Sequence, residues 1–360
     1  MKTAVIAIGG NAILLAGERG TKEEQVDNLK VTCKHLAELV REGYDLVLTH
    51  GNGPQVGNIM LQNEVSEDSG PSANGSKELK KYNERELSLF AGFKFLDYRA
   101  EKKVFGQPPR MPLDVCGAES QGETGYLFQQ ILTNELEHLG IKKTVVSVVT
   151  QVLVDRDDPA FQNPTKPIGP YYGEEEAERL MRERGWKMIN DEARGGWRRV
   201  VPSPVPKEIV ERDAIMRLVF SGKDSGIIVI AGGGGGIPVI RAENTLRYEG
   251  VEAVIDKDLA ASVLARNIHE ELFVILTDVE KVALNFRTEN QKDLGELSLE
   301  EARKYLAEGQ FPLGSMGPKI EAAISFLESG GKEVIITSPD NLLKAIIEGK
   351  GTHIKRVKSL

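Results

Sequence analysis

Residues 4–13 have the sequence AVIAIGGNAI. Its apolar first half predicts a buried β-strand, and two glycines and an asparagine follow that strand directly. Because glycine lets backbone N–H groups close around anionic oxygens, the stretch predicts a strand that ends in a phosphate-holding turn. A plain tight turn explains the glycines equally well. Neither lysine nor arginine lies between Lys2 and Arg19, so the positive charge for a phosphate has to come from elsewhere in the chain.

Strand-like and helix-like stretches alternate along the chain. After the first strand, residues 22–43 carry apolar side chains at helical spacing, and Gly43 is expected to end that helix. Further strand-like runs lie at 44–54, 143–154, 226–236, 271–278 and 332–338. This alternation predicts an α/β fold with a largely parallel sheet covered by helices on both faces. Ligands gather at the carboxyl ends of such strands, and here those ends carry GGN, HGNG, GGGGG and TD.

Two stretches interrupt the alternation. Residues 155–206 contain both tryptophans and much of the proline, and we expect them to form a protruding lid subdomain. Residues 65–110 begin with the turn-rich sequence SEDSGPSANGS and continue with a helical pattern. That pattern predicts one helix, or two helices broken near Gly92.

Composition excludes several classes of protein. A net charge of −8 over 360 residues argues against a non-specific nucleic-acid binder, which needs a basic face. No apolar run reaches the roughly 20 residues that span a bilayer, and nothing at the N-terminus resembles a secretory leader. The chain has two cysteines, Cys33 and Cys116, so we expect no disulfide framework and a reducing cytoplasm.

The second glycine turn comes after His50 in the sequence HGNGPQVGNIM. Residues 51–53 form a polar turn, and the helical pattern after Pro54 would point free N–H groups at an anion. His50 is a candidate base, but no serine or cysteine nucleophile motif accompanies it. We therefore favour a hydrogen-bonded residue at the end of a strand.

The glycine run at 232–236 does not fit the common nucleotide motifs. It leads into the strand-like sequence IPVI, whereas a GxGxxG dinucleotide motif opens a helix. The chain also lacks a GxxxxGK[ST] P-loop. Consecutive glycines after a strand still allow the backbone to approach a ligand closely.

Three lysines are candidates for the missing charge. Lys166 lies between prolines in QNPTKPIGP and is expected in a rigid loop, and Lys319 lies at the start of a predicted helix in GSMGPKIEAA. Lys257 stands between Asp256 and Asp258 just before another helix, where one aspartate is expected to be the N-cap. A lone lysine is usually a solvated surface residue. Three of them in loops rich in Gly, Pro and Asp indicate phosphoryl transfer, which depends on positioning and charge neutralisation.

Together these motifs resemble the carbamate kinases, a branch of the amino acid kinase family. The matching stretches cover nearly the whole chain in order: AIGGNA (7–12), THGNGPQVGN (49–58), MPLDVCGAESQGETGY (111–126), VTQVLVDRDDPAFQNPTKPIGPYY (149–172), VVPSPVP (200–206), AGGGGGIPV (231–239), GVEAVIDKDLA (250–260), LTDVEKV (276–282) and PLGSMGPKIEAA (312–323).

The resemblance implies one amino acid kinase domain over residues 1–360, folded as a three-layer α/β/α sandwich, and a homodimer. It implies reversible phosphoryl transfer between ATP and carbamate, giving ADP and carbamoyl phosphate, with Mg²⁺ as cofactor. It further implies operation toward ATP synthesis in fermentative arginine catabolism. Many members of the wider family have a lysine where this chain has Ala7, and carbamate kinases instead bring in the lysine of the NPTKP loop, here Lys166.

The resemblance also implies roles for individual residues. The catalytic set is Lys166, Lys257, Lys319 and Asp258, with the aspartate orienting the lysines. The carbamate and the transferring group would be held by Gly9, Gly10, Asn11, Gly51, Asn52 and Gly53. The nucleotide would lie along Gly233, Gly234, Thr277, Asp278, Val282, Met316 and Gly317. No residue is assigned as a metal ligand.

Two departures from the family pattern stand out. The 65–110 stretch is an atypical insertion, longer by roughly thirty residues than the connection expected there, and its apolar content suggests packing on a dimer partner. The sequence VALNF at 282–286 stands where relatives more often have tyrosines, so adenine packing is less well specified than phosphate binding.

Two other functions remain open at this point. A related kinase could act on another small acceptor, such as acetylglutamate, aspartate or UMP, although a lid over the site leaves little room for a longer side chain. A non-enzymatic nucleotide-binding scaffold could recruit a partner through residues 65–110. The complete set of lysines and glycine turns argues against the scaffold.

Overall fold

The computed structural model describes residues 2–15, 18–68, 110–191, 195–220, 226–243, 245, 247–312 and 314–356. The helices expected within 65–110 lie outside these residues, apart from the end of helix α2 (Gly53–Asp68). Across the described ranges, no helix combines the length and the apolar character needed to cross a membrane.

The core of the molecule is an eight-stranded sheet with the order β15-β17-β16-β12-β1-β2-β9-β3. Its strands are β1 (Lys2–Ile8), β2 (Tyr44–His50), β3 (Thr144–Ser147), β9 (Ile227–Ile230), β12 (Leu272–Leu276), β15 (Glu296–Ser298), β16 (Glu333–Thr337) and β17 (Thr352–Lys355). All neighbouring pairs are parallel except β16 with β17. The expected largely parallel sheet is confirmed.

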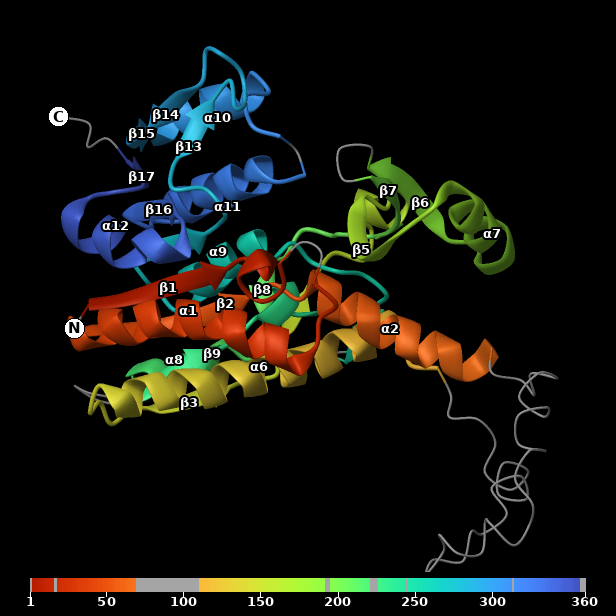
Figure 1. Ribbon diagram of the computed structural model, residues 1–360, viewed down its shortest axis with the longest axis horizontal. Helices are drawn as coiled ribbons and strands as arrows, with labels where there is room; N and C mark the ends of the chain where they lie inside the picture. The colour runs from red at the N-terminus through yellow and green to blue at the C-terminus, as the bar shows by residue number, and fades with distance from the viewer. Residues whose placement is uncertain are drawn as a thin grey trace, which may run out of the picture.

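Helices cover both faces of this sheet (Figure 1). Successive side chains of a strand point to opposite faces, and β1 divides its apolar residues accordingly. Val5 and Ala7 pack in the layer of α8 (Arg212–Phe220), α9 (Lys257–Asn267), α10 (Leu299–Ala307) and α11 (Met316–Glu328). Ala4, Ile6 and Ile8 pack in the layer of α1 (Lys22–Arg41), α6 (Leu113–His138) and α12 (Leu342–Glu348). The three-layer α/β/α fold is thereby confirmed.

The prediction of a single strand over residues 143–154 is wrong. The structure divides it between β3 in the main sheet and β4 (Gln151–Leu153) in a second sheet, which has the order β11-β10-β4-β8. The other strands there are β8 (Glu208–Ile209), β10 (Ile237–Arg241) and β11 (Tyr248–Gly250). Thr150 separates β3 from β4 because the buried Gln121 side chain bonds both its N–H (2.8 Å) and its carbonyl (3.1 Å). An apolar run alone does not reveal such a change of sheet.

A third sheet protrudes beside the main body (Figure 1). It consists of β5 (Lys166–Tyr172), β6 (Lys187–Asp191) and β7 (Gly196–Val201), with helix α7 (Glu174–Arg184) after β5. Lys166 was expected in a loop, but it is the first residue of β5 and pairs with Val201 of β7. The flanking prolines remain compatible with a strand because β5 pairs on one side only, with β7, among the described strands. A separate hairpin joins β13 (Val282–Leu284) to β14 (Lys292–Leu294).

The small sheet rests on helix α2 through a contact between two glycines. A Cβ atom built on Gly57 would overlap the Cα atom of Gly169 in β5, and Gly169 itself has a φ of +70°. Beside this contact, the buried Ile168 packs with Val56 and Met60 of α2. The base of the protruding sheet is therefore fixed to the main body by backbone proximity and apolar burial.

We expect Gly57→Ala to destabilise the protein by about 1–3 kcal/mol, because the added methyl forces β5 away from α2. The matched control is Gly122→Ala in α6, where nothing lies within 4 Å of the new Cβ atom. That change should stabilise by about 0.5–1 kcal/mol, the usual helix preference for alanine. Urea unfolding of both variants measures the difference, and equal midpoints would contradict the glycine contact.

Candidate active site

Four neighbouring strands bring their carboxyl ends to one edge of the sheet. Strands β12, β1, β2 and β9 are adjacent and parallel, so TD, GGN, HGNG and the glycine run all lie there. A Cβ atom on Gly51 would lie 2.9 Å from Gly10 N and 3.3 Å from Lys257 Cδ. A Cβ atom on Gly9 would lie 3.2 Å from Leu276 O, at the end of β12. The expected clustering of the two turns is confirmed.

The two turns lead into different elements. Gly10 and Asn11 belong to a short 3₁₀ turn, η1 (Gly10–Ala12), whereas Gly53 is the first residue of α2. Gly51 N–H donates to Ile8 O at 2.9 Å, which ties the second turn to the end of β1. The backbone groups of both turns are thus held in a fixed relation to each other.

The run of five glycines has a packing explanation that the sequence pattern does not reveal. A Cβ atom on Gly233 would lie 2.5 Å from His50 Nε2, and one on Gly234 would overlap the amide of Asn52. Cβ atoms on Gly235 and Gly236 would overlap Ile255 O and the Val152 side chain, respectively. Positive φ angles at 232 and 234–236 add a second requirement for glycine. The run allows this loop, with its short turn η5 (Gly233–Gly235), to lie directly against the second turn.

Buried polar side chains hold the same loop in place. Thr49 Oγ1 donates to Gly232 O, and Gly232 N–H donates to Thr150 Oγ1, both at 2.9 Å. Gln121 Nε2 donates to Gly233 O at 2.9 Å. From the same helix α6, Ser120 Oγ accepts a 2.5 Å bond from the Asn52 side chain. Sequence reasoning missed Ser120, Gln121 and Thr150, because no spacing pattern marks side chains that meet only in the folded chain.

His50 is enclosed at the end of β2. Its ring is 1% exposed and stacks on Phe128 with 5.7 Å between the ring centroids. Nδ1 lies 3.1 Å from Gly51 O, and because a carbonyl can only accept, that nitrogen carries the proton. Burial lowers the pKa of His50 to about 4, so the ring is neutral at pH 7. These contacts agree with a hydrogen-bonded residue at a strand end.

Two of the predicted lysines share one buried carboxylate. Lys257 Nζ lies 2.5 Å from Asp258 Oδ1, and Lys319 Nζ lies 3.1 Å from Asp258 Oδ2. Lys257 begins α9 and Lys319 lies in the first turn of α11, so the carboxylate joins two helices. The Asp258 side chain is 4% exposed, and both lysine side chains are less than 15% exposed.

The two amines differ in how burial and charge combine. Burial lowers the pKa of Lys257, and the attraction of Asp258 only partly opposes this. Burial also acts on Lys319, but the carboxylates of Asp258, Asp256 and Asp278 together outweigh it and raise the pKa of that lysine. Asp258 therefore favours the charged form of both amines, against the burial that disfavours it.

The third lysine reaches the same helix from the protruding sheet. Lys166 Nζ lies 2.7 Å from Asp256 Oδ2. Asp256 is the N-cap of α9, and its Oδ1 accepts from the N–H groups of Asp258 (2.9 Å) and Leu259 (3.3 Å). The expected capping role is confirmed, whereas the contact with Lys166 was not anticipated. Burial opposes ionisation of Asp256, yet Lys166 and Lys257 hold the pKa of its carboxyl well below the usual range.

The residues predicted along the nucleotide fall into three groups. Thr277 and Asp278 follow β12, where Thr277 N–H donates to Thr337 O at 2.9 Å and Asp278 is exposed. Met316 and Gly317 open α11, just before Lys319. The Val282 side chain is fully buried in the apolar core, and Gly233 and Gly234 are enclosed against the second turn. Of these residues, the structure brings Asp278 and the start of α11 close to Lys319. The nucleotide-binding roles of all of them stay predictions.

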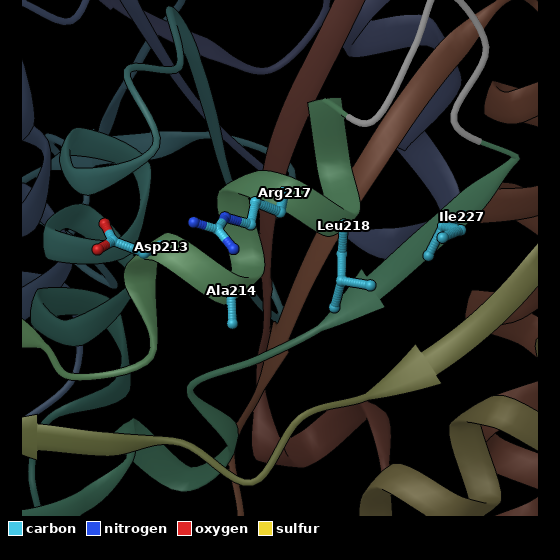
Figure 2. Close-up of a pocket in the computed structure, with 5 residues that line it drawn as sticks. All are labelled: Asp213, Ala214, Arg217, Leu218 and Ile227. Carbon is cyan, nitrogen blue, oxygen red and sulfur yellow. The ribbon is translucent and has the colours of Figure 1, made fainter.

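A surface hollow of about 600 Å³ lies elsewhere in the molecule, lined by Asp213, Ala214, Arg217, Leu218 and Ile227 (Figure 2). Ile227 is the first residue of β9, whereas the glycine run comes after the last residue of that strand. The hollow is therefore at the opposite end of β9 and contains none of the predicted site residues.

Comparisons with known proteins agree with this architecture. Residues 2–338 match the model of the amino acid kinase family. Carbamate kinase from Pyrococcus furiosus is 46% identical, over 98% of this chain and 99% of that protein. The enzyme from Trichomonas vaginalis is also 46% identical, over 97% of this chain and 98% of its own length.

Solved structures give the same result. Carbamate kinase from Giardia lamblia bound to AMP-PNP superimposes with a TM-score of 0.79 at 39% identity, covering 99% of both chains. A protein from Aeropyrum pernix has a TM-score of 0.81 at 40% identity, covering 99% of this chain and 100% of its own. The chain therefore belongs to the amino acid kinase family, within its carbamate kinase branch, and is a phosphotransferase.

Proposed function

We propose that this phosphotransferase catalyses the reversible reaction of ATP with carbamate to give ADP and carbamoyl phosphate. The observation that carries the proposal is the convergence of Lys166, Lys257 and Lys319 on the N-terminal end of α9, beside the two glycine turns. Three amines at one place suit a phosphoryl group, whose negative charge spreads over several oxygens during transfer.

In this proposal the phosphoryl group passes directly in line between the two substrates. The three lysines stabilise its charge, and the backbone amides of residues 9–11 and 51–53 act as fixed dipoles around it. Asp258 orients Lys257 and Lys319, as the shared carboxylate contacts support. Neutral His50 is not needed as a general base, because carbamate is already nucleophilic. No covalent intermediate with the protein is required.

We further propose ATP or ADP with Mg²⁺ as the cofactor. The AMP-PNP complex of the Giardia lamblia relative supports the nucleotide. Within the described residues, no three histidine, cysteine or acidic side chains gather as a metal site. This fits an ion carried mainly by the nucleotide phosphates, since Mg²⁺ commonly takes one or two carboxylates and keeps its waters. Asp278, exposed near Lys319, is the residue available to contribute, and the ion would neutralise phosphate charge.

The remaining parts of the proposal concern assembly and setting. We propose that residues 155–206 act as the lid that delivers Lys166, and that the chain is a homodimer. The position of β3 supports the dimer, because it is an edge strand that pairs with β9 alone among the described strands. Two buried, unpaired cysteines suit a cytoplasmic protein. The reaction would run toward ATP in fermentative arginine catabolism.

The direct test supplies purified protein with carbamoyl phosphate, ADP and Mg²⁺ and measures ATP. We expect ATP to form, and to form only when all three are present. The reverse reaction is then measured with ATP and a panel of acceptors comprising carbamate, acetylglutamate, aspartate and UMP. Preference for any acceptor other than carbamate would replace the proposed substrate.

We expect Lys166→Ala to lower kcat by about 10²–10³, the usual effect of losing one electrostatic donor to the transition state. The matched control is Lys207→Ala, which removes an exposed lysine paired with Asp155. Steady-state kinetics of both variants give the comparison. Near-wild-type turnover of Lys166→Ala would remove this lysine from the site.

Asp258→Asn should change the pH dependence of turnover. The pKa of Lys257 is already lowered by burial, and loss of the carboxylate lowers it further. Because the amine acts in its protonated form, activity is lost as the pH rises through its pKa, so the variant loses activity at lower pH than wild type. Profiles of kcat against pH measure this, with circular dichroism to establish folding. An unchanged alkaline limb would contradict the role of Asp258.

A further inference from the structure

One carboxylate connects the protruding sheet to the phosphate end of the candidate site. Asp256 uses Oδ1 for the two backbone N–H groups at the start of α9 and Oδ2 for Lys166 Nζ. The two oxygens therefore have separate partners, one within α9 and one that comes from β5, 90 residues earlier in the chain. Its side chain is 14% exposed, so neither contact is a loose surface pairing.

The backbone of β5 is already fixed without Asp256. Lys166 pairs with Val201 of β7, and three residues later Gly169 is packed on Gly57 of α2. What the backbone leaves free is the long side chain of Lys166, which is 31% exposed. A four-carbon chain at this exposure samples several rotamers unless its end is held. Asp256 holds that end.

The arrangement repeats the one around Asp258. Each ammonium group has three N–H donors and gives one to an aspartate, which leaves donors for phosphate oxygens. Asp256 and Asp258 contact the three ammonium groups directly, and Asp278 adds its negative charge near Lys319. The backbone N–H of Asp258 also donates to Asp256, which joins the two carboxylates to a single helix end.

We propose that Asp256 is the positioning residue for Lys166, which holds the amine of the protruding sheet at the N-terminus of α9 so that it faces the transferring phosphoryl group. This inference rests on the proposed function of the site. It gives Asp256 a role separate from helix capping, and the two roles can be distinguished by substitution.

The decisive variant is Asp256→Asn. Asparagine caps a helix about as well as aspartate, so the bonds to the start of α9 are kept while the charge facing Lys166 is lost. We expect kcat to fall about tenfold, with KM changed less than about threefold, because the amine is present but misplaced. The matched control is Asp27→Asn, which breaks the exposed pair with Lys30 in α1, outside the lid, and should leave kcat unchanged.

A double-mutant cycle separates positioning from general structural damage. Asp256→Asn in the Lys166→Ala background should change kcat by less than about twofold, since the side chain that it positions is absent. A loss of kcat that persists in the Lys166→Ala background would show that Asp256 acts through α9 or through the charges of Lys257 and Lys319, and not through Lys166, and would overturn the proposal. A wild-type kcat in the single Asp256→Asn variant would also overturn the proposal.

A measurement without substrates keeps the inference independent of the proposed reaction. A short pulse of acetic anhydride followed by mass spectrometry reports how reactive each amine is, because acetylation needs an accessible and unprotonated amine. Asp256→Asn should increase acetylation of Lys166 about threefold or more, with Lys207 unchanged as internal reference. Equal labelling of Lys166 in both proteins would overturn the proposal. If wild type forms no ATP from carbamoyl phosphate, the proposed function fails, and this labelling still decides whether Asp256 holds Lys166.

Discussion

The three ammonium groups at this end of the sheet repel one another, and the site must hold them close together. Two ammonium groups about 4 Å apart repel by roughly 4 kcal/mol at an intermediate dielectric. The sequence Asp256-Lys257-Asp258 reduces this repulsion by alternating negative and positive charges at the start of α9. The first aspartate caps the helix, and the second contacts both Lys257 and Lys319. Burial of Lys257 is tolerable because the carboxylate of Asp258 is buried beside it.

The glycines help to assemble the same site, because they allow the two turns and the loop at 232–236 to approach one another closely. Gly51 lies against Gly10 and Lys257, and the run at 232–236 lies against His50 and Asn52. Side chains at these positions would push the loops apart and separate the backbone amides from the amines. The buried bonds from Gln121 and Thr49 then fix the loops in this packing. Dipoles fixed in this way need no rearrangement when charge develops on a phosphoryl group.

How much of this could be predicted from sequence depends on the range of each interaction. Apolar runs such as 4–8 and 272–276 indicate their own burial, so the parallel sheet and the edge where its glycine turns meet were predictable. Contacts between residues far apart in the chain leave no comparable pattern in the sequence. Lys166 opens a strand because β7 pairs with it, and Thr150 breaks the 143–154 run because Gln121 bonds it. The contact of Asn52 with Ser120 likewise joins residues 68 positions apart.

The capping of α9 has a consequence for how an anion can bind here. Helix N-termini often bind phosphate through their free N–H groups, but Asp256 already occupies those of Asp258 and Leu259. In the proposed site, phosphate is therefore bound by side-chain amines, which come from three elements: β5, α9 and α11. The amine from β5 is held at the helix because the base of its sheet packs on α2 through Gly57 and Gly169. The position of this charge therefore depends on the packing of the protruding sheet on α2, whereas a site built from helix dipoles alone depends only on the helix.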